Sequence, residues 1–343
     1  MAGHPCHDAH LTSITLTFLN GPDIERLALT NDEILAAVEA GLLAQGRGQT
    51  VIEPRVHLEP DPAFRGHFNV LRGYVAPLGL AGVKIVGDYL DNHLQGLPSE
   101  MALLNLFDPR TGMPKAVLDA TAITDMRTGA LTALGAKYLA RSDSRTLGHV
   151  GARGTAYWNV RLLDHLFHFD SIKVHSRRPE SREPFARRLS QDLGKEVVAT
   201  EDWPSCLDGA DIMVEASRLE QRQELFRASW VQPGAFVVPY GTVSALELGL
   251  TDVMDKIVVD DVGQFRAGTM GALRPHIDSG RISESSLYGE LGQIVAGLIA
   301  GRESDTERIL FWHRGLSLSD IALGAAMLDK AAAMGIGQQL DYA

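Results

Sequence analysis

The chain has 343 residues, of which 45% are hydrophobic and 22% are charged. This composition is typical of a soluble globular protein, and the length is sufficient for two domains. The formal net charge of −11 disfavours a nucleic-acid-binding surface. No apolar run approaches the roughly 18 residues of a membrane-spanning helix. Residues 1–10 look like a loose tail without the pattern of a secretion signal, so we expect a cytoplasmic protein.

The first third of the chain predicts a strand, a helix and then a series of strands. The first strand covers residues 14–18, and the helix covers residues 31–45 with Asn31 as its N-cap. Further strands are expected within residues 55–58, 67–77, 81–89, 101–108 and 115–118. Neighbouring strands joined by short turns, such as Asp108–Gly112, indicate an antiparallel or mixed sheet.

From Thr121 onward, helices alternate with short apolar strands. A helical stripe from Ile123 to Tyr138 comes first. Strands are then expected at residues 145–151, 172–176, 196–200, 211–216, 236–241 and 256–261, with helices at 155–167, 181–193, 287–300 and 319–334. This alternation predicts an α/β fold in which βαβ units form a parallel sheet.

The first strand–helix turn of the alternating region contains Gly148, Gly151 and Gly154. A glycine turn between a strand and a helix suits a dinucleotide pyrophosphate, because the N–H groups and dipole of the helix N-terminus favour anions. The G-x-G-x-x-G spacing is imperfect, since Arg153 interrupts it. A tight turn without any ligand is the alternative interpretation.

The second strand of this region ends in His175-Ser176-Arg177-Arg178. In NAD-preferring sites, an acidic residue at this point binds the ribose 2′-hydroxyl. No acid is present here, and Ser176 with Arg177 suits a 2′-phosphate, so the segment favours NADP(H) while NAD(H) stays possible. The alternative is that both arginines only solvate a loop.

Several basic side chains are candidates for binding an anion. Arg127 lies near the start of a helix, and its planar fork suits a carboxylate or a phosphate. Lys84 occupies an otherwise apolar strand, where an inward-pointing lysine would be a carboxylate clamp or an acid–base group of lowered pKa. From this segment alone, a lysine on the solvated face is the simpler interpretation, and Arg55 has the same two alternatives. His313 and Arg314 either face a ligand or belong to a helix-entry loop.

The motifs of several enzyme classes are missing from the sequence. No HExxH, CxxC, GxSxG or GxxxxGK[ST] occurs, so the zinc-protease, serine-hydrolase and P-loop classes lack support. Cys6 and Cys206 have no metal-ligand spacing and imply no disulfide framework. We therefore expect no bound metal.

The chain resembles the ornithine cyclodeaminase/mu-crystallin family over residues 51–324. The segments that carry the resemblance are GVKIV, LFDPRTGMPKAVLDATAITDMRTGALTALGAKYLA, YGELGQIVAGLIAGRES and FWHRGLSLSDIA. The resemblance implies a homodimer. In each subunit, residues 1–120 and 315–343 would form a mixed α/β substrate and dimerisation domain, and residues 121–314 a Rossmann domain for NAD(H) or NADP(H). It also implies hydride transfer at the α-carbon of a small amino acid or cyclic imine.

By position, the resemblance assigns the substrate carboxylate to Arg55, Lys84 and Arg127, with Lys84 also protonating the imine nitrogen. The fork of Arg127 could instead contact a cofactor phosphate. Tyr240 and Thr242, at the end of a strand, would line the substrate pocket. The expected cofactor contacts, including those argued above, are Ser99, Arg127, Gly151, Arg153, Gly154, Thr155, Ser176, Arg177 and Ser217.

The sequence departs from the family pattern at three places. At the glycine turn, Arg153 and Thr155 replace a glycine and a glutamine. The cyclodeaminating members carry an aspartate after the strand that precedes Tyr240, whereas no acid occurs here before Glu247. Near the last helix, His313 replaces a small residue, and together with Arg314 it would offer an extra cation to a second substrate carboxylate.

With these departures in mind, we consider three functions in order of preference. The first is an NAD(P)H-dependent imine reductase or amino-acid dehydrogenase. An ornithine cyclodeaminase-type lyase, which releases ammonia with catalytic NAD, is the alternative, and the missing aspartate disfavours it. A non-catalytic protein that binds NADPH or another small ligand is the further alternative.

Overall fold

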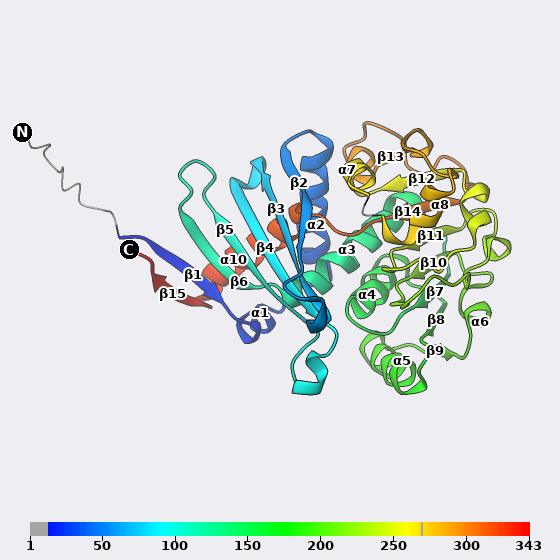
Figure 1. Cartoon of the computed structure of the whole chain (residues 1–343), viewed down its shortest axis with the longest axis horizontal. Helices are drawn as coiled ribbons and strands as arrows, with labels where there is room; N and C mark the ends of the chain where they lie inside the picture. Colours follow the sequence, from blue (N-terminus) through cyan, green and yellow to red (C-terminus); the bar gives the residue numbers. More distant parts are fainter. Residues whose placement is uncertain (1–12, 269) are drawn as a thin grey trace, which may run out of the picture.

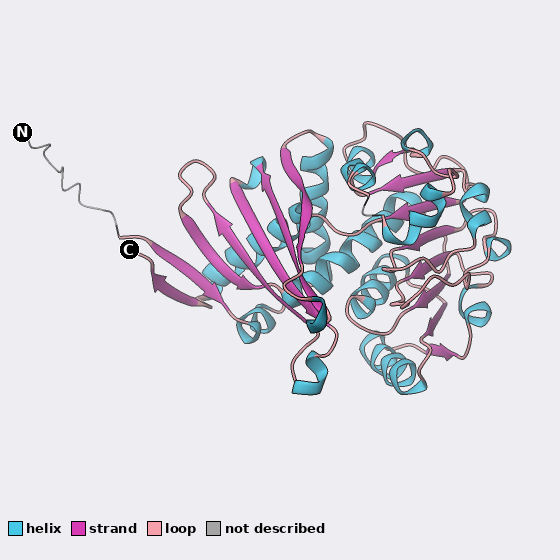
Figure 2. Ribbon diagram, viewed as in Figure 1, coloured by secondary structure: helices cyan, strands magenta, loops and turns pink. Residues whose placement is uncertain are grey.

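The computed structural model describes residues 13–268 and 270–343, and it contains two β-sheets with helices packed against them (Figures 1 and 2). Residues 1–10, expected to form a tail, lie outside the described residues. Among the described residues, no helix is long and apolar enough to cross a membrane.

The first sheet, here called the mixed sheet, is built from the N-terminal part of the chain and the last strand. In sheet order its strands are β15 (Gln338–Asp341), β1 (Thr15–Leu19), β6 (Pro114–Asp119), β5 (Glu100–Phe107), β4 (Leu80–Tyr89), β3 (Gly66–Val75) and β2 (Thr50–Leu58). The β1–β6 pair is parallel and the other pairs are antiparallel. The prediction of an antiparallel or mixed sheet is confirmed.

The second sheet, here called the parallel sheet, contains eight strands, and all of its recorded pairs are parallel. In sheet order they are β13 (Gly289–Glu290), β12 (Lys256–Val259), β14 (Ile309–Trp312), β11 (Phe236–Pro239), β10 (Ile212–Glu215), β7 (Thr146–Val150), β8 (Ser171–His175) and β9 (Val197–Thr200). The predicted βαβ region therefore forms the expected sheet, and the α/β fold class is confirmed.

Helices cover both sheets and join them. The α-helices are α1 (Gly21–Leu27), α2 (Asn31–Gly46), α3 (Thr121–Leu139), α4 (Ala156–Phe167), α5 (Pro179–Leu193), α6 (Trp203–Leu207), α7 (Val262–Arg266), α8 (Arg274–Asp278), α9 (Leu291–Val295) and α10 (Ser317–Met334). The 3₁₀ helices are η1 (Pro62–Phe64), η2 (Ala76–Leu78), η3 (Asn92–Gln95), η4 (Ala228–Trp230), η5 (Leu248–Val253), η6 (Gly271–Leu273) and η7 (Glu284–Ser286).

Two long helices position the site. α10 packs against α2 and against β3 and β4 of the mixed sheet, so the C-terminal part of the chain returns to the N-terminal part. α3 packs against α4 and α2, and Figure 1 shows it running from the mixed sheet toward the parallel sheet. Leu104 and Ile321, which are both fully buried, belong to the core between α10 and the mixed sheet.

Two local predictions were wrong, and one strand was missed. Helix α2 is capped by Thr30 rather than Asn31, because the Thr30 hydroxyl accepts from the N–H of Glu33 at 3.2 Å, and the Glu33 carboxylate accepts in return at 2.7 Å. The helix expected over residues 287–300 is only the short α9 after β13, and the chain reverses at Gly297, whose φ is +71°. Strand β14 was not predicted, because a buried run of four residues has no period that distinguishes a strand from a helix.

Candidate active site

The expected cofactor and substrate residues of the parallel sheet all follow strand ends. Because the strands are parallel, the segments after β7, β8, β10, β11 and β14 lie at one edge of the sheet, where ligands bind in open α/β sheets. Two contacts place this edge against the mixed sheet. Arg55 of β2 donates to the carbonyl of Arg314 after β14, and Arg218 after β10 pairs with Glu100 of β5.

Lys84 lies at the centre of the interface between β4, α3 and α10. Its side chain is 1% exposed, and its Nζ donates to Oδ1 of Asp320 at 2.6 Å and to Oγ1 of Thr124 at 3.1 Å. The same Asp320 oxygen accepts from Nε of Arg127 at 2.9 Å. One carboxylate therefore holds two cations from separate elements. We call Lys84, Arg127 and Asp320 the ion triad.

The solvent-facing interpretation of Lys84 is wrong. Along β4, Gly82, Lys84 and Val86 are buried, whereas Ile85 is 40% exposed. The face of β4 that packs toward α10 is thus the one that carries the lysine, and an isoleucine takes the outer face. Buried and more exposed residues still alternate along β4. The lysine, however, lies on the buried face and the isoleucine on the exposed face, which is the reverse of the usual arrangement.

Burial lowers the pKa of Lys84 to about 7, and the nearby Arg127 charge lowers it further while Asp320 raises it. An ammonium removed from water loses its hydration, so the neutral amine becomes accessible. Near neutral pH, both the protonated and the neutral form of Lys84 are therefore populated. A group with that property can donate or accept a proton.

The turn between β14 and α10 is held from two sides. Nη2 of Arg55 donates to the carbonyls of Arg314 and Gly315 at 3.1 and 3.2 Å. Oδ2 of Asp260 accepts from the N–H groups of the same two residues at 2.9 and 3.0 Å. Gly315 has a φ of +83°, and a Cβ there would lie 1.5 Å from Nη1 of Arg127. Only glycine allows the guanidinium to approach this turn so closely.

Two guanidinium groups keep donors for a further acceptor. Nε of Arg55 and Nη1 of Arg127 are buried and have no hydrogen-bond partner among the described residues. Buried donors are normally satisfied, and an unsatisfied one costs free energy. A carboxylate entering between the two sheets would supply acceptor oxygens for both arginines.

The turn after β7 requires a glycine at position 151 for internal reasons. Gly151 has a φ of +115°, and a Cβ there would lie 2.7 Å from the carbonyl oxygen of Ala216. Arg153 and Gly154 are exposed at the start of α4, where the helix N-terminus favours an anion. Thr155 is the N-cap of α4, yet its hydroxyl makes no cap bond and instead contacts the hydroxyl of Tyr240 at 2.7 Å.

A series of buried polar side chains, connected by hydrogen bonds, contacts this turn. Nδ1 of His149 donates to the carbonyl of Gly151 at 3.0 Å, so its Nε2 is the acceptor for the amide of Asn159, also at 3.0 Å. The Asn159 amide also donates to the hydroxyl of Tyr240. Burial lowers the pKa of His149 to about 4, so this histidine is neutral at physiological pH.

His313 extends this series of polar contacts from Tyr240 to Thr132 on α3. Its ring lies 4.7 Å from the ring of Tyr240, and its Nε2 contacts Oγ1 of Thr132 at 2.9 Å. Burial, with a smaller effect of the Arg127 charge, lowers the pKa of His313 to about 3. His313 is therefore a neutral side chain, and the extra positive charge expected from the pair His313 and Arg314 resides on Arg314.

The other expected residues lie at the surface of the site. Ser99 is exposed before β5, where its carbonyl accepts from the N–H of Tyr89 at 2.9 Å, and Thr242 is exposed after β11. Ser176 is half-buried and Arg177 is exposed after β8.

Ser217 after β10 donates its N–H, at 2.8 Å, and its hydroxyl to the carboxylate of Glu215. Burial raises the pKa of Glu215 to about 7, while these bonds lower it. The hydroxyl of Ser217 is thus engaged by its own loop.

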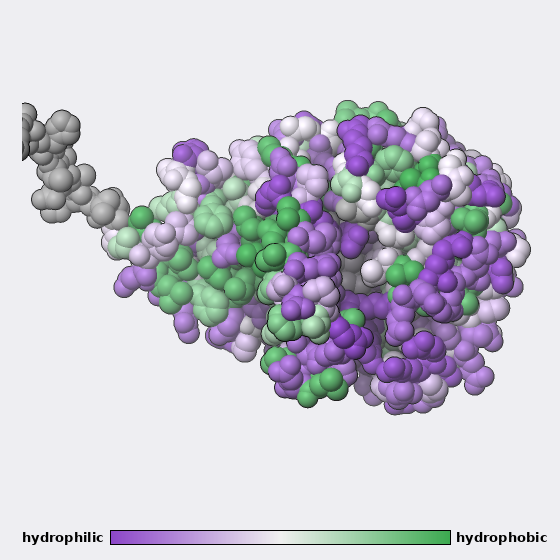
Figure 3. All heavy atoms as spheres, in the orientation of Figure 1, coloured by the Kyte–Doolittle hydropathy of each residue, from purple (hydrophilic) through white to green (hydrophobic). Residues whose placement is uncertain are grey.

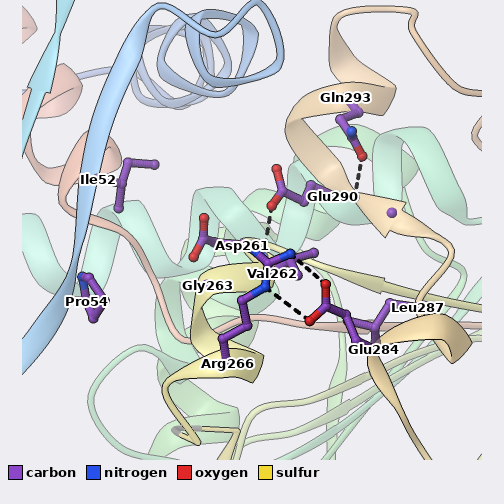
Figure 4. A pocket seen from close by; sticks show the side chains of 11 residues that line it. Ile52, Pro54, Asp261, Val262, Gly263, Arg266, Glu284, Leu287, Glu290 and Gln293 are labelled. Atoms are coloured by element: carbon purple, nitrogen blue, oxygen red, sulfur yellow. Dashed lines mark hydrogen bonds and ion pairs between the residues drawn. The ribbon is translucent and has the colours of Figure 1, made fainter.

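A hollow of about 410 Å³ opens beside the ends of β2 and β12 (Figure 4). Figure 4 shows Ile52 and Pro54 on one side and the acidic side chains of Asp261, Glu284 and Glu290 on the other. Among the described residues, no group of three or more His, Cys, Asp or Glu side chains is arranged to hold a metal ion.

Two buried acids were missed in the sequence. Asp320 lies in the first turn of α10, 236 residues from Lys84, and Asp260 follows β12. An acid in the first turn of a helix and an acid directly after a strand were the available signals. Neither signal identifies the distant partner.

The chain is similar to known proteins over most of its length. The model of the ornithine cyclodeaminase/mu-crystallin family matches residues 17–335. Alanine dehydrogenase of Archaeoglobus fulgidus is 30% identical over 328 residues, which cover 94% of this chain and 98% of that protein. The structure is similar to Thermococcus litoralis Δ¹-pyrroline-2-carboxylate reductase in complex with NADH and L-proline, with a TM-score of 0.87 at 28% identity over 95% of this chain and 100% of that one. An archaeal alanine dehydrogenase dimer with bound NAD gives the same TM-score and identity over 96% and 100%.

The buried Lys84 predicts a pH dependence of stability. Its pKa is about 7 in the folded chain, against about 10.4 for an unfolded lysine, so unfolding takes up a proton between these values. The free energy of unfolding should therefore rise with pH by about 1.4 kcal/mol per unit, between about pH 7 and 10, relative to Lys84→Met. Urea unfolding of both proteins at several pH values measures this.

The matched control is Lys115→Met, because the Lys115 side chain is 37% exposed. This variant should keep the pH slope of the natural protein. Parallel pH dependences for the natural protein and Lys84→Met would contradict a lowered lysine pKa.

Proposed function

Because the chain belongs to the ornithine cyclodeaminase/mu-crystallin family, we propose that it is an NAD(P)H-dependent imine reductase or amino-acid dehydrogenase. The substrate is a small amino acid or the corresponding imine, and a hydride is transferred at the α-carbon. The observation that carries the proposal is the ion triad, in which Arg127 keeps an unsatisfied buried donor, together with the unsatisfied buried donor of Arg55.

The proposed substrate pocket is formed between the two sheets. Nε of Arg55 and Nη1 of Arg127 would hold the substrate carboxylate, since both donors are buried without a partner among the described residues. Lys84 protonates the imine nitrogen in reduction and takes the proton back in oxidation, and its pKa of about 7 suits both directions. Thr124 and Asp320 keep its Nζ in position.

The glycine turn fits a dinucleotide, and we assign the pyrophosphate to it. Gly151, Arg153, Gly154 and Thr155 surround the N-terminus of α4, and the close contact of Gly151 with the carbonyl of Ala216 leaves no room for a side chain. When bound, the nicotinamide supplies or accepts the hydride. The remaining proposed cofactor contacts are Ser99, Ser176, Arg177 and Ser217.

Tyr240 and Thr242 follow β11 between the turn and the substrate region, and we propose that they line the pocket. The same segment disfavours the cyclodeaminase function. Residues 239–244 contain no acid, and Glu247 serves the local fold, because its carboxylate accepts from the N–H of Ala228 at 2.9 Å. The segment therefore supplies no carboxylate of its own, and Glu215, which lies against Gly241, accepts from the N–H of Ser217 at 2.8 Å.

We also propose that the protein is a homodimer, with residues 1–120 and 315–343 forming the substrate and dimerisation domain and residues 121–314 the dinucleotide-binding domain. The outer face of the mixed sheet supports the proposal. Ile85 and Leu103 are cross-strand neighbours that are 40% and 48% exposed, and Met101 is 43% exposed. Figure 3 shows the apolar surface over this sheet. Contiguous apolar patches of this kind mark protein–protein interfaces.

Reduction of a cyclic ketimine tests the enzymatic proposal. Lys84→Ala should lower kcat/KM by ~10²-fold or more, because a positioned proton donor is lost. In the natural protein, kcat/KM for reduction should fall as the pH rises through about 7, where Lys84 loses its proton. NADPH and NADH absorbance measures both effects, and Lys115→Ala is the control that should stay active.

Other outcomes identify the other functions. Full activity of Lys84→Ala would remove this residue from the mechanism. Ammonia release from ornithine with catalytic NAD would identify a cyclodeaminase. Tight NADPH binding without turnover of any amine or imine would identify a binding protein.

The choice of cofactor is tested at Arg177. The absence of an acid after β8, with Arg177 exposed at that point, supports recognition of a 2′-phosphate. Arg177→Ala should weaken NADPH binding by ~1–3 kcal/mol, as expected for a hydrogen bond to a charged group, and leave NADH binding nearly unchanged. Calorimetric titration with each cofactor measures this, with the exposed Arg187→Ala on α5 as the control. Equal losses for both cofactors would argue against it.

The dimer is tested on the outer face of the mixed sheet. Leu103→Lys should convert the dimer to a monomer, because it places a charge in an apolar interface. Light scattering coupled to gel filtration gives the mass. Val198→Lys, on the 44% exposed Val198 of β9, is the matched control and should stay dimeric. A monomeric natural protein, or a Leu103→Lys dimer, would refute the proposed interface.

A further inference from the structure

A series of hydrogen bonds connects both ends of the glycine turn after β7 with Tyr240, which follows β11. At the first end, Nδ1 of His149 contacts the carbonyl of Gly151 at 3.0 Å. At the second end, the hydroxyl of Thr155 contacts the hydroxyl of Tyr240 at 2.7 Å. Asn159 on α4 completes the series, because its amide nitrogen contacts both Nε2 of His149 and the hydroxyl of Tyr240.

The carbonyl of Gly151 fixes the direction of the first bonds. A carbonyl only accepts, so Nδ1 of His149 is the donor. Burial lowers the pKa of His149 to about 4, so the ring is neutral and its Nε2 is an acceptor. The amide nitrogen of Asn159 therefore donates one hydrogen to His149 and the other to Tyr240. The reverse orientation of the amide would place its oxygen against Nε2, and two acceptors would face each other.

The phenolic hydrogen of Tyr240 then needs an acceptor of its own. Within the part of the chain that the structure describes, the hydroxyl of Tyr240 has only Asn159 and Thr155 as hydrogen-bond partners. Burial raises the pKa of Tyr240 to about 12, so the hydrogen is present at physiological pH. If Thr155 were the donor, the phenolic hydrogen would stay unsatisfied, which costs free energy. Tyr240 is therefore the donor and Thr155 the acceptor.

This direction leaves the hydroxyl hydrogen of Thr155 available. Thr155 is the N-cap residue of α4, yet its side chain caps none of the N–H groups of the helix. Those N–H groups and the helix dipole favour an anion at this end. Among residues 13–268 and 270–343, Tyr240 is the one hydrogen-bond partner of the Thr155 hydroxyl. Thr155 thus offers a further donor where the helix already attracts an anion.

The ring of Tyr240 is held in place on its other side. It lies 4.7 Å from the ring of His313, which in turn contacts the hydroxyl of Thr132 on α3 at 2.9 Å. In the parallel sheet, β10 separates β11 from β7. The side chain of Tyr240 therefore reaches across the end of β10 to the start of α4, and it connects the substrate side of the sheet with the glycine turn.

We infer that Tyr240 is a positioning residue for the cofactor, because its hydroxyl orients Thr155 to donate a hydrogen bond to the pyrophosphate. The inference rests on the proposed function, which assigns the pyrophosphate to this turn. Tyr240 acts through Thr155 and does not itself contact the pyrophosphate. This role is separate from the lining of the substrate pocket, which is proposed for the same side chain.

Tyr240→Phe removes the hydroxyl and keeps the ring, and ADP-ribose separates the two roles because it carries the pyrophosphate without the nicotinamide. In calorimetric titrations of Tyr240→Phe, the Kd values for ADP-ribose, NADPH and NADH should rise by the same factor of about 10, as expected when a hydrogen bond to a charged group is lost. The KM for a cyclic ketimine at saturating cofactor should stay nearly unchanged. Tyr342→Phe, at a tyrosine that is 63% exposed, is the matched control and should bind as the natural protein does.

Variants of Thr155 test the same connection from its other end. Thr155→Val should raise the Kd for ADP-ribose about 10-fold, whereas Thr155→Ser, which keeps the hydroxyl, should retain most of the affinity. In the double variant Tyr240→Phe/Thr155→Val, the loss should not exceed that of Thr155→Val alone, because Tyr240 acts through Thr155.

Weaker binding of NADPH and NADH with unchanged binding of ADP-ribose in Tyr240→Phe would overturn the inference and leave only the pocket-lining role. Unchanged binding of all three ligands, or additive losses in the double variant, would overturn it as well. A natural protein that binds none of the three would remove the cofactor assignment together with the inference. The expected changes in Kd in a protein that reduces no imine would support the inference and contradict the reductase proposal.

Discussion

The structure depends on one carboxylate, that of Asp320, which binds Lys84 and Arg127 at once in the buried ion triad. Each charge there has lost its hydration, so the triad is stable only as a complete set, and loss of one partner typically costs about 3–5 kcal/mol. The three residues belong to α10, β4 and α3. The C-terminal helix must therefore pack against the N-terminal sheet before the triad can form.

The turn between β14 and α10 transmits this constraint to the parallel sheet. Gly315 packs closely against the guanidinium of Arg127. Arg55 of β2 donates to the carbonyl of Gly315, and the carboxylate of Asp260, which follows β12, accepts from the N–H of Gly315. Arg314 is thus placed by contacts from both sheets. Because Arg55 belongs to β2 and Arg127 to α3, a substrate carboxylate held by both, as proposed, would lie between the sheets.

Much of the architecture could be predicted from the sequence, because the mixed and parallel sheets follow from local alternation and turn residues. The details that failed have physical reasons. The face on which Lys84 lies depends on α10, which is distant in sequence, and the partner Asp320 is 236 residues away. Strand β14 is a short apolar run with no period of its own, and the segment around Gly297 reverses where an apolar stripe suggested a continuous helix.

One departure of the glycine turn from the family pattern, Thr155, takes part in a network of buried polar side chains. Thr155 contacts Tyr240, and Tyr240 continues to Asn159 and, by ring contact, to His313. Burial keeps the ring of His313 neutral, with a pKa of about 3, and raises the pKa of Tyr240 to about 12, so these side chains carry no charge. An uncharged series of side chains can connect the glycine turn to His313 without repelling an anion bound at either end. The proposed binding of the substrate carboxylate is therefore left to Arg55 and Arg127, which keep unsatisfied buried donors.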